Sequence, residues 1–294
     1  MTTRFDELCE LLGLEEIDLN IYRGQNERGQ VGRLFGGQVL AQSLMAAGRT
    51  VEGLAPHSLH GYFLRPGDPG IPVLYTVDRI RDGRSFTTRR VVAIQHGRAI
   101  FNLAASFHAA EEGYEHQSKM PHAPDPESLP TWMEQLRAHR DRVPDFAARE
   151  KRGGPPIDFR FVHLPTYLGG EPGDDPNLIW LRAHGELDPA DALLHQGLLT
   201  YATDMSLIDT IVRHHARSRR DATISMAASL DHAVWFHRPF RADHWILYAQ
   251  DSPSAAGGRG FARGALYTRD GSLIASVAQE GLIRPPRAVP DLPS

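Results

Sequence analysis

One motif occurs twice in this chain, and both copies are followed by further matches in the same order. Phe63-Leu64-Arg65-Pro66 recurs as Phe236-His237-Arg238-Pro239, at an offset of 173 residues. The downstream matches are 83–86 with 258–261 at an offset of 175, and 97–100 with 271–274 at an offset of 174. Collinear matches at nearly one offset indicate an internal duplication. A chain of 294 residues has room for two packed units of about 130 residues each.

The segments that follow each motif have the composition of β-strands. In the first copy, residues 74–80 and 85–94 are rich in β-branched and aromatic side chains, with a charged turn between them. Glycine-containing turns then precede the last strands, which we predict at 99–108 and 272–283. Each half is therefore predicted to form an antiparallel meander.

One apolar helix is predicted upstream of each meander. The first begins at Gly37 and stops near Gly48, with Leu40, Leu44 and other apolar residues recurring at helical spacing. The second is predicted over 190–215, as a single helix with a similar apolar stripe. A largely apolar helix followed by a twisted antiparallel sheet that wraps around it describes a hotdog unit.

The expected fold class is α+β, a tandem or double hotdog in which two antiparallel sheets each wrap around a central helix. We divide the chain into an N-terminal hotdog domain at 1–112, a linker at 113–156 and a C-terminal hotdog domain at 157–294. The linker is rich in proline and charge. Within these units we expect a short amphipathic helix at 131–139, early strands of the second sheet at 157–164 and 178–183, and a polar loop at 169–175.

Composition excludes several classes of function. The net charge of −4 and the pI of 6.4 provide no broad basic field for nucleic acid or an anionic membrane. Cys9 is the only cysteine, so an internal disulfide and a cysteine-based zinc site are both excluded. Residues 1–20 lack the apolar core of a signal peptide, and no stretch approaches about 18 apolar residues. We expect a cytoplasmic protein with no membrane span and no cofactor.

Asp204 is the residue that the predicted second helix explains least well. It lies among residues expected to face the core, where an unpaired carboxylate is costly and where burial would raise its pKa towards that of a general base. Periodicity alone leaves open a second interpretation, a solvated aspartate on the polar face of the helix. Ser229 at a strand start and Gln279 in the last strand are uninformative singly.

Several motifs resemble those of the acyl-CoA thioesterase II family, the double-hotdog thioesterases. They are Asp-His-Ala-Val-Trp-Phe-His-Arg-Pro at 231–239, Arg-Gly-Phe at 259–261, Ser276 to Gly281, Phe-Gly-Gly-Gln-Val at 35–39, the run at 57–68, and Asp-Gly-Arg-Ser-Phe at 82–86. The similarity spans roughly residues 5–285.

The resemblance implies that Asp204, Ser229 and Gln279 together hold a water molecule that attacks a fatty acyl-CoA thioester. Ser229 stands where some members of the family have threonine, which keeps the hydroxyl. A thioester carbonyl is electrophilic, so water activated by a carboxylate can attack it if the developing oxyanion is stabilised. We expect the stabilising N–H at a helix amino end or a glycine loop. A dimer or tetramer of the chain is expected from the resemblance only.

Two other functions are alternatives for this sequence. Enoyl-CoA hydratases of double-hotdog type use Asp and His at the spacing of Asp209 and His214, but here the residues between them continue an apolar helical stripe without Asn-Pro. An acyl-CoA-binding module without catalysis would keep the pocket but would not need all of Asp204, Ser229 and Gln279.

The histidines do not predict a metal site, because no His-Glu-x-x-His motif or cysteine set accompanies them. The first copy lacks the candidate catalytic residues: Gln279 corresponds to Ala105, and the first helix has no carboxylate. We therefore expect one active site per chain, with the first half as scaffold and as part of the pocket wall.

Overall fold

The computed structural model describes residues 3–30, 32–144, 146–152, 154–215 and 226–285. The first half contains α1 (Arg4–Leu12), β1 (Glu15–Asp18), β2 (Ile21–Gly24), α2 (Gly36–Gly48), β3 (Ala55–Phe63), β4 (Val73–Asp82), β5 (Phe86–Gln95) and β6 (Arg98–His108). The linker contributes α3 (Trp132–Ala138) and α4 (Phe146–Arg152). The second half contains β7 (Ile157–Phe161), β8 (Asn177–Ala183), α5 (Ala192–Thr203), α6 (Leu207–Arg213), β9 (Met226–Ser229), β10 (Asp231–Phe236), β11 (Ile246–Ala256), β12 (Arg259–Thr268) and β13 (Leu273–Arg284).

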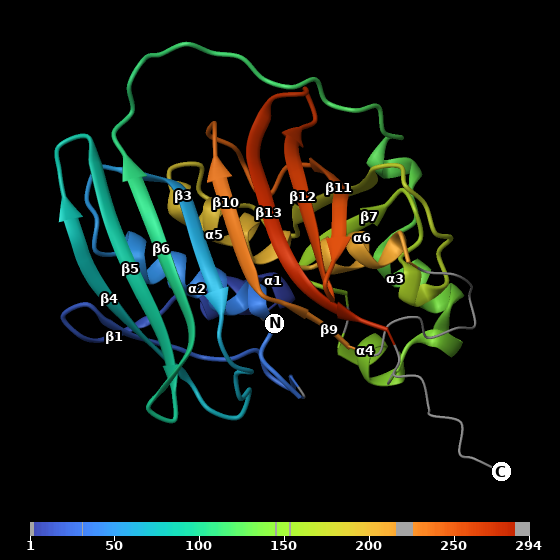
Figure 1. Ribbon diagram of the computed structural model, residues 1–294, viewed down its shortest axis with the longest axis horizontal. Coiled ribbons are helices and arrows are strands. Elements are labelled where there is room, and N and C mark those ends of the chain that lie inside the picture. The colour runs from blue at the N-terminus through green and yellow to red at the C-terminus, as the bar shows by residue number, and fades with distance from the viewer. Residues whose placement is uncertain (1–2, 31, 145, 153, 216–225, 286–294) are drawn as a thin grey trace.

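All described strands belong to one antiparallel sheet with the order β1-β2-β4-β5-β6-β3-β10-β13-β12-β11-β8-β7, and β9 pairs with β13 (Figure 1). The halves meet where β3 pairs with β10, with Leu59 opposite Val234. The order on one side of this junction mirrors the order on the other. The predicted double hotdog is confirmed, and its two sheets are continuous.

The repeated Arg-Pro motif makes the same hydrogen bonds in both copies. The N–H groups of Leu64 and Arg65 donate to the carbonyl of Ile100, and those of His237 and Arg238 donate to the carbonyl of Ile274. The guanidinium of Arg65 donates to the carbonyl of Ala99, and that of Arg238 donates to the carbonyl of Leu273. In both copies this acceptor is the residue just before the isoleucine. The motif therefore recurs because each copy fixes the end of one strand to the start of the last strand of its half.

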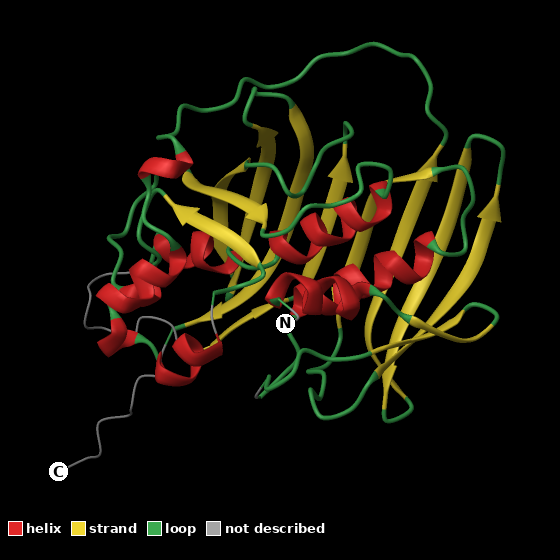
Figure 2. Cartoon of the chain, turned by 180° about the vertical axis from the view of Figure 1, so that it is seen from behind, coloured by secondary structure: helices red, strands yellow, loops and turns green. Residues whose placement is uncertain are grey.

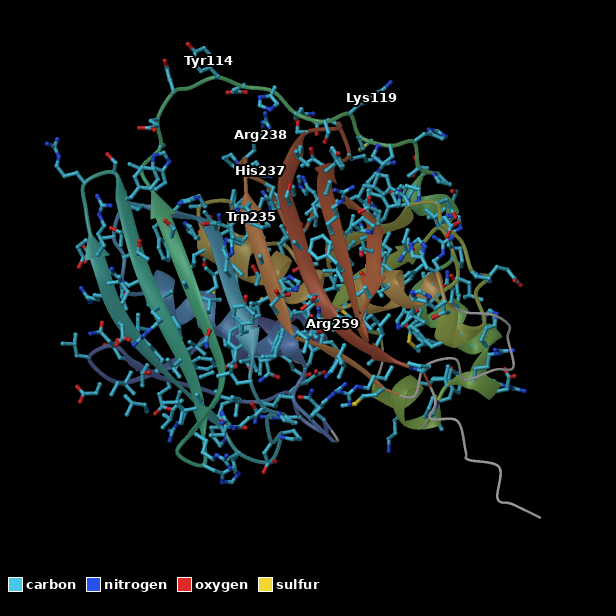
Figure 3. All side chains as sticks on the ribbon, viewed as in Figure 1. Tyr114, Lys119, Trp235, His237, Arg238 and Arg259 are labelled. Carbon is cyan, nitrogen blue, oxygen red and sulfur yellow. The ribbon has the colours of Figure 1, made fainter. Side chains whose placement is uncertain are left out.

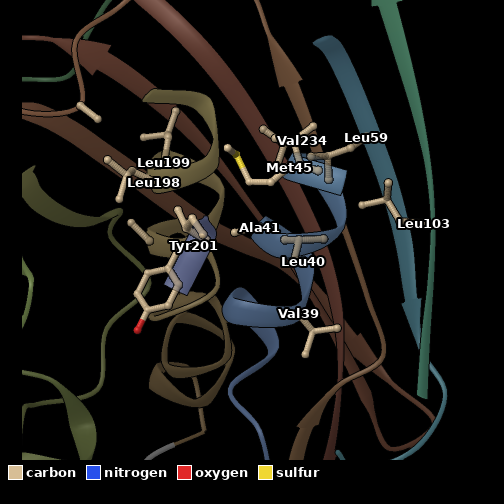
Figure 4. Packing of buried hydrophobic residues seen from close by; sticks show 14 of the residues in the cluster. Val39, Leu40, Ala41, Met45, Leu59, Leu103, Leu198, Leu199, Tyr201 and Val234 are labelled. Carbon is tan, nitrogen blue, oxygen red and sulfur yellow. The ribbon is translucent and has the colours of Figure 1, made fainter. Parts of the chain in front are cut away.

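The helices lie against one face of the sheet (Figure 2). α2 and α5 run antiparallel, since a Cβ on Gly37 would meet the carbonyl of Tyr201 at 2.4 Å and a Cβ on Gly48 would meet Leu193 at 2.5 Å. Glycines at both ends let the two helices approach closely. Figure 4 shows apolar side chains from both helices meeting those of the sheet: Val39, Leu40, Ala41, Met45, Leu198, Leu199, Tyr201, Leu59, Leu103 and Val234.

The prediction of a single helix over 190–215 is wrong. α5 ends at Thr203 and α6 begins at Leu207, so Asp204 is the C-cap of α5 and does not lie inside a helix. At the break the sheet provides hydrogen-bond partners: Tyr248 donates its hydroxyl to the carbonyl of Thr203 at 3.3 Å, and Gln250 donates to Ser206 Oγ at 2.5 Å. Short polar side chains favour such non-helical arrangements.

Most remaining local predictions are confirmed. The short linker helix is α3, which begins with a capping box between Thr131 and Glu134. The turn between β5 and β6 has positive φ at His96 (49°) and Gly97 (69°), as a two-residue hairpin of type I′ requires. Strands β7 and β8 begin the second sheet where expected.

The linker passes over the top of the sheet in Figure 3, where Tyr114 and Lys119 mark its course. Further along, Met120, Ala123 and Leu129 pack against a small apolar cluster formed by Leu178, Trp180, Trp245, Leu247 and Tyr267. Ser118 Oγ also lies 2.8 Å from the hydroxyl of Tyr267. The linker is thus packed onto the second half.

Candidate active site

The structure brings together the three residues singled out in the sequence. Ser229 Oγ donates to Asp204 Oδ1 at 3.3 Å, and Gln279 Nε2 donates to Ser229 Oγ at 2.6 Å. Asp204 comes from the end of α5, Ser229 from the end of β9, and Gln279 from the middle of β13. The pairing of β9 with β13, with Ser229 opposite Gly281, holds the hydroxyl and the amide together.

Asp204 is buried. Its exposed fraction is 9%, and that of Gln279 is 0%. The interpretation of Asp204 as a solvated residue on a polar helix face is therefore wrong. Burial disfavours the charged carboxylate and raises the pKa of Asp204 to about 7. Hydrogen bonds from Ser229, Gly37 and Gln279 and the positive charge of Arg33 act in the opposite direction.

The first half closes the site with the amino end of α2. The backbone N–H of Gly37 is close enough to the carboxylate of Asp204 to lower its pKa. Gly36 packs directly against the carboxylate, since a Cβ at this position would lie 2.6 Å from Asp204 Oδ2 and 2.9 Å from the ring of Phe63. The first turn of a helix presents N–H groups and a partial positive charge. Asp204 is thus held between the carboxyl end of α5 and the amino end of α2.

His232 joins the same hydrogen-bond network, a role that was not predicted from the sequence. Its Nδ1 lies 2.5 Å from Gln279 Oε1, and its Nε2 lies 3.0 Å from Thr203 Oγ1. The signal that could have found it is the alternation along β10, in which His232 faces inward on the same side of the strand as Val234 and Phe236. A histidine at an inward position next to Gln279 has to find polar partners there.

The residues of the alternative hydratase site are engaged elsewhere. The carboxylate of Asp209 accepts hydrogen bonds from the hydroxyl and the N–H of Thr166. His214 Nδ1 lies 3.0 Å from Asp174 Oδ1. The Asp209 and His214 spacing is therefore a coincidence of sequence.

Within the described ranges, no group of three or more histidine, cysteine or acidic side chains is arranged to hold a metal ion. A search of the same ranges found no helix of the length and apolar character needed to cross a bilayer.

The fold defines the class of protein. Its architecture matches a solved protein from Alicyclobacillus acidocaldarius described as having a hot dog fold, with a TM-score of 0.74 and 19% identity over 97% of this chain and 100% of that one. The chain is a double-hotdog protein.

The sequence comparisons define the family. The profile of the family described as acyl-CoA thioesterase matches residues 156–282, and the profile described as the acyl-CoA thioesterase N-terminal domain matches residues 26–108. Acyl-coenzyme A thioesterase 8 of Mus musculus is 40% identical, over 94% of this chain and 88% of that protein. Acyl-CoA thioesterase 2 of Haemophilus influenzae is 38% identical, over 97% and 99%. The crystal structure of an acyl-CoA thioesterase II from Mycobacterium marinum has a TM-score of 0.78 and 41% identity, over 96% and 99%. The chain belongs to the acyl-CoA thioesterase family.

Proposed function

We propose that this protein hydrolyses acyl-CoA to a free fatty acid and CoA, with Asp204 as the general base that activates the attacking water. Membership of the acyl-CoA thioesterase family supports the reaction. The observation that supports the assignment of residues is the contact of the buried Asp204 carboxylate with Ser229, which in turn accepts from Gln279.

The hydrolysis needs no covalent acyl-enzyme. A water molecule beside Asp204 transfers a proton to the carboxylate as its oxygen attacks the thioester carbon. The tetrahedral intermediate then collapses, the C–S bond breaks, and the CoA thiolate takes up a proton from Asp204. In this scheme Ser229 and Gln279 orient the water, and the ionised form of Asp204 is the active one.

The developing oxyanion needs hydrogen-bond donors. The amino end of α2 lies beside Asp204. Gly36 packs against the carboxylate, and Gly37 packs against the carbonyl of Tyr201 in α5. Backbone N–H groups in a first helical turn are suitable donors for a negatively charged oxygen. In this scheme the first half of the chain supplies the oxyanion site and the second half supplies the base.

The experiment is thiol release from a panel of acyl-CoAs of increasing chain length, followed with a chromogenic thiol reagent. We expect release by the wild-type protein, and a loss of kcat by at least about 100-fold in Asp204→Asn, with KM nearly unchanged. Gln279→Ala is expected to lose less, because the orientation of water is shared. Turnover of Asp204→Asn near the wild-type rate would show that the base is wrongly assigned. Binding of acyl-CoA without release at any chain length would favour a binding module.

Two further proposals concern the setting of the enzyme. We propose that the chain assembles as a dimer or tetramer and acts in the cytoplasm. We further propose the division into domains at 1–112 and 157–294 around the linker 113–156. Light scattering would measure the assembly, fractionation of cells would give the location, and separate expression of each range would test the domain boundaries.

A further inference from the structure

His232 is a fully buried titratable residue that the proposed reaction does not use. It is 1% exposed and lies on β10, next to the junction of the two halves, where it pairs with Gly61 of β3. Burial lowers the pKa of His232 to about 4, so the imidazole is neutral at neutral pH and carries one N–H. The carboxylate that faces it is Asp204, with Nδ1 3.8 Å from Oδ1.

The hydrogen bonds of the network determine which nitrogen carries that proton. Gln279 Nε2 donates to Ser229 Oγ, so Gln279 Oε1 is the atom that faces His232. A carbonyl oxygen only accepts, and Nδ1 lies 2.5 Å from it. With the amide in this orientation Nδ1 is the protonated nitrogen. The unprotonated Nε2 then lies 3.0 Å from the hydroxyl of Thr203, which is also within 2.9 Å of the carbonyl of Thr200. The donors then run in one direction, from His232 through Gln279 and Ser229 to Asp204.

The first half of the chain shows what the fold alone needs at this position. At the offsets of the repeat, His232 corresponds to Leu59 and Gln279 corresponds to Ala105. Leu59 and Ala105 are directly opposite each other across β3 and β6, and both are buried. The same fold therefore accepts an apolar pair at this place, and the polar pair of the second half has a purpose other than packing.

We propose that His232 is a positioning residue for the proposed reaction: its Nδ1–H holds the Gln279 amide in the one orientation that donates to Ser229. An amide has nearly the same shape when its oxygen and nitrogen exchange places, so packing alone does not select the orientation. With the amide reversed, its oxygen would face Ser229, and the serine proton would turn from Asp204 to Gln279. The inference rests on the proposed function of Asp204, Ser229 and Gln279.

A kinetic double-mutant cycle tests this role. His232→Leu introduces the residue that the first half carries, and we expect kcat to fall about 10- to 100-fold with KM changed less than about threefold. Because His232 acts through Gln279, the double variant His232→Leu/Gln279→Ala should be no slower than Gln279→Ala, within about threefold. A wild-type kcat in His232→Leu, or a double variant slower than Gln279→Ala by the full product of the two effects, would overturn the proposal.

A conservative variant separates positioning from structural support. The amide nitrogen of an asparagine side chain can occupy the place of Nδ1, whereas that of glutamine lies nearer the place of Nε2. We therefore expect His232→Asn to retain kcat within about fivefold of wild type, and His232→Gln to lose it like His232→Leu. Equal losses in the asparagine and leucine variants, with unfolding midpoints like that of wild type, would contradict the proposal.

A measurement on the wild-type protein tests the role of His232 without relying on activity. The ¹⁵N chemical shifts of labelled histidine at pH 7.5 distinguish the two neutral tautomers, and the spectrum of His232→Asn assigns the signal. We expect the Nδ1–H tautomer. The Nε2–H tautomer would overturn the role of His232 even if Asp204→Asn confirms the base, whereas an active Asp204→Asn would reject the proposed mechanism and leave the tautomer result unaffected.

Discussion

Gly36 of the first half lies against Asp204 of the second, so closely that a Cβ on this glycine would come within 2.6 Å of Asp204 Oδ2. The two residues are far apart in the sequence and meet because the amino end of α2 faces the carboxyl end of α5. The duplication therefore did more than produce a catalytic half and an inert half. The helix of the first copy forms one wall of the site in the second.

Gly36→Ala should displace the Asp204 carboxylate from the water position. A displacement of about 1 Å can cost about 100-fold in rate, so we expect kcat to fall by about that factor. Thiol release measures the effect, and Gly113→Ala is the matched control, since a Cβ there has no atom within 4 Å. An unchanged kcat in Gly36→Ala would mean that the carboxylate does not need its present position.

The activity should depend on pH through Asp204. Its pKa of about 7 means that the active, ionised form is lost as the pH falls through 7. We expect kcat/KM to decrease about tenfold per pH unit well below this value and to reach a plateau above it. Initial rates between pH 5 and 9 would show the limb, and a flat profile down to pH 5 would contradict a base with a raised pKa.

Arg33 should set the position of that acidic limb. Its positive charge lowers the pKa of Asp204, so Arg33→Gln should raise this pKa and move the limb to higher pH. The loss of activity should be larger at pH 6 than at pH 9. Arg90→Gln is the control, because Arg90 is exposed and pairs with the exposed Asp78. A limb that moves equally in both variants would reflect a change in overall charge only.

Asp204→Asn should make the folded protein more stable at alkaline pH. The pKa is near 3.8 in the unfolded chain and about 7 when folded, so between these values the folded state holds a proton that the unfolded state has released. Stability therefore falls as the pH rises from 4 to 7, by on the order of 4 kcal/mol at most. Urea unfolding at pH 8 and pH 5 would measure it, with Glu52→Gln as an exposed control. A variant less stable than wild type at pH 8 would contradict this account.

Ser229 should tolerate threonine but not alanine. Its hydroxyl both donates to Asp204 and accepts from Gln279, and threonine keeps that hydroxyl. We expect Ser229→Thr to retain kcat within about threefold and Ser229→Ala to lose about 10- to 100-fold. Steady-state thiol release compares them, and similar rates in all three proteins would exclude a role for the hydroxyl.

Much of the fold was predictable from the repeat. Residues at nearly constant offset, such as Arg65 and Arg238, make equivalent hydrogen bonds, and the alternation of apolar residues gave most strands to within a few residues. Asp204 could be singled out as a carboxylate among residues expected to face the core, although the pattern left a solvated position open. Ser229 and Gln279 could be singled out only by their resemblance to a family, because each is an ordinary residue by local pattern.

The sequence by itself determined the duplication, the α+β class and the strands of each half, because these depend on periodicity and turn residues within short segments. Only the tertiary structure decided that the second helix breaks before Ser206, that Gly36 contacts Asp204, and that His232 faces Gln279. These features depend on hydrogen bonds and close contacts between segments distant in the chain. Local sequence patterns do not record which partner satisfies a buried polar group, and the pKa of Asp204 depends on those partners.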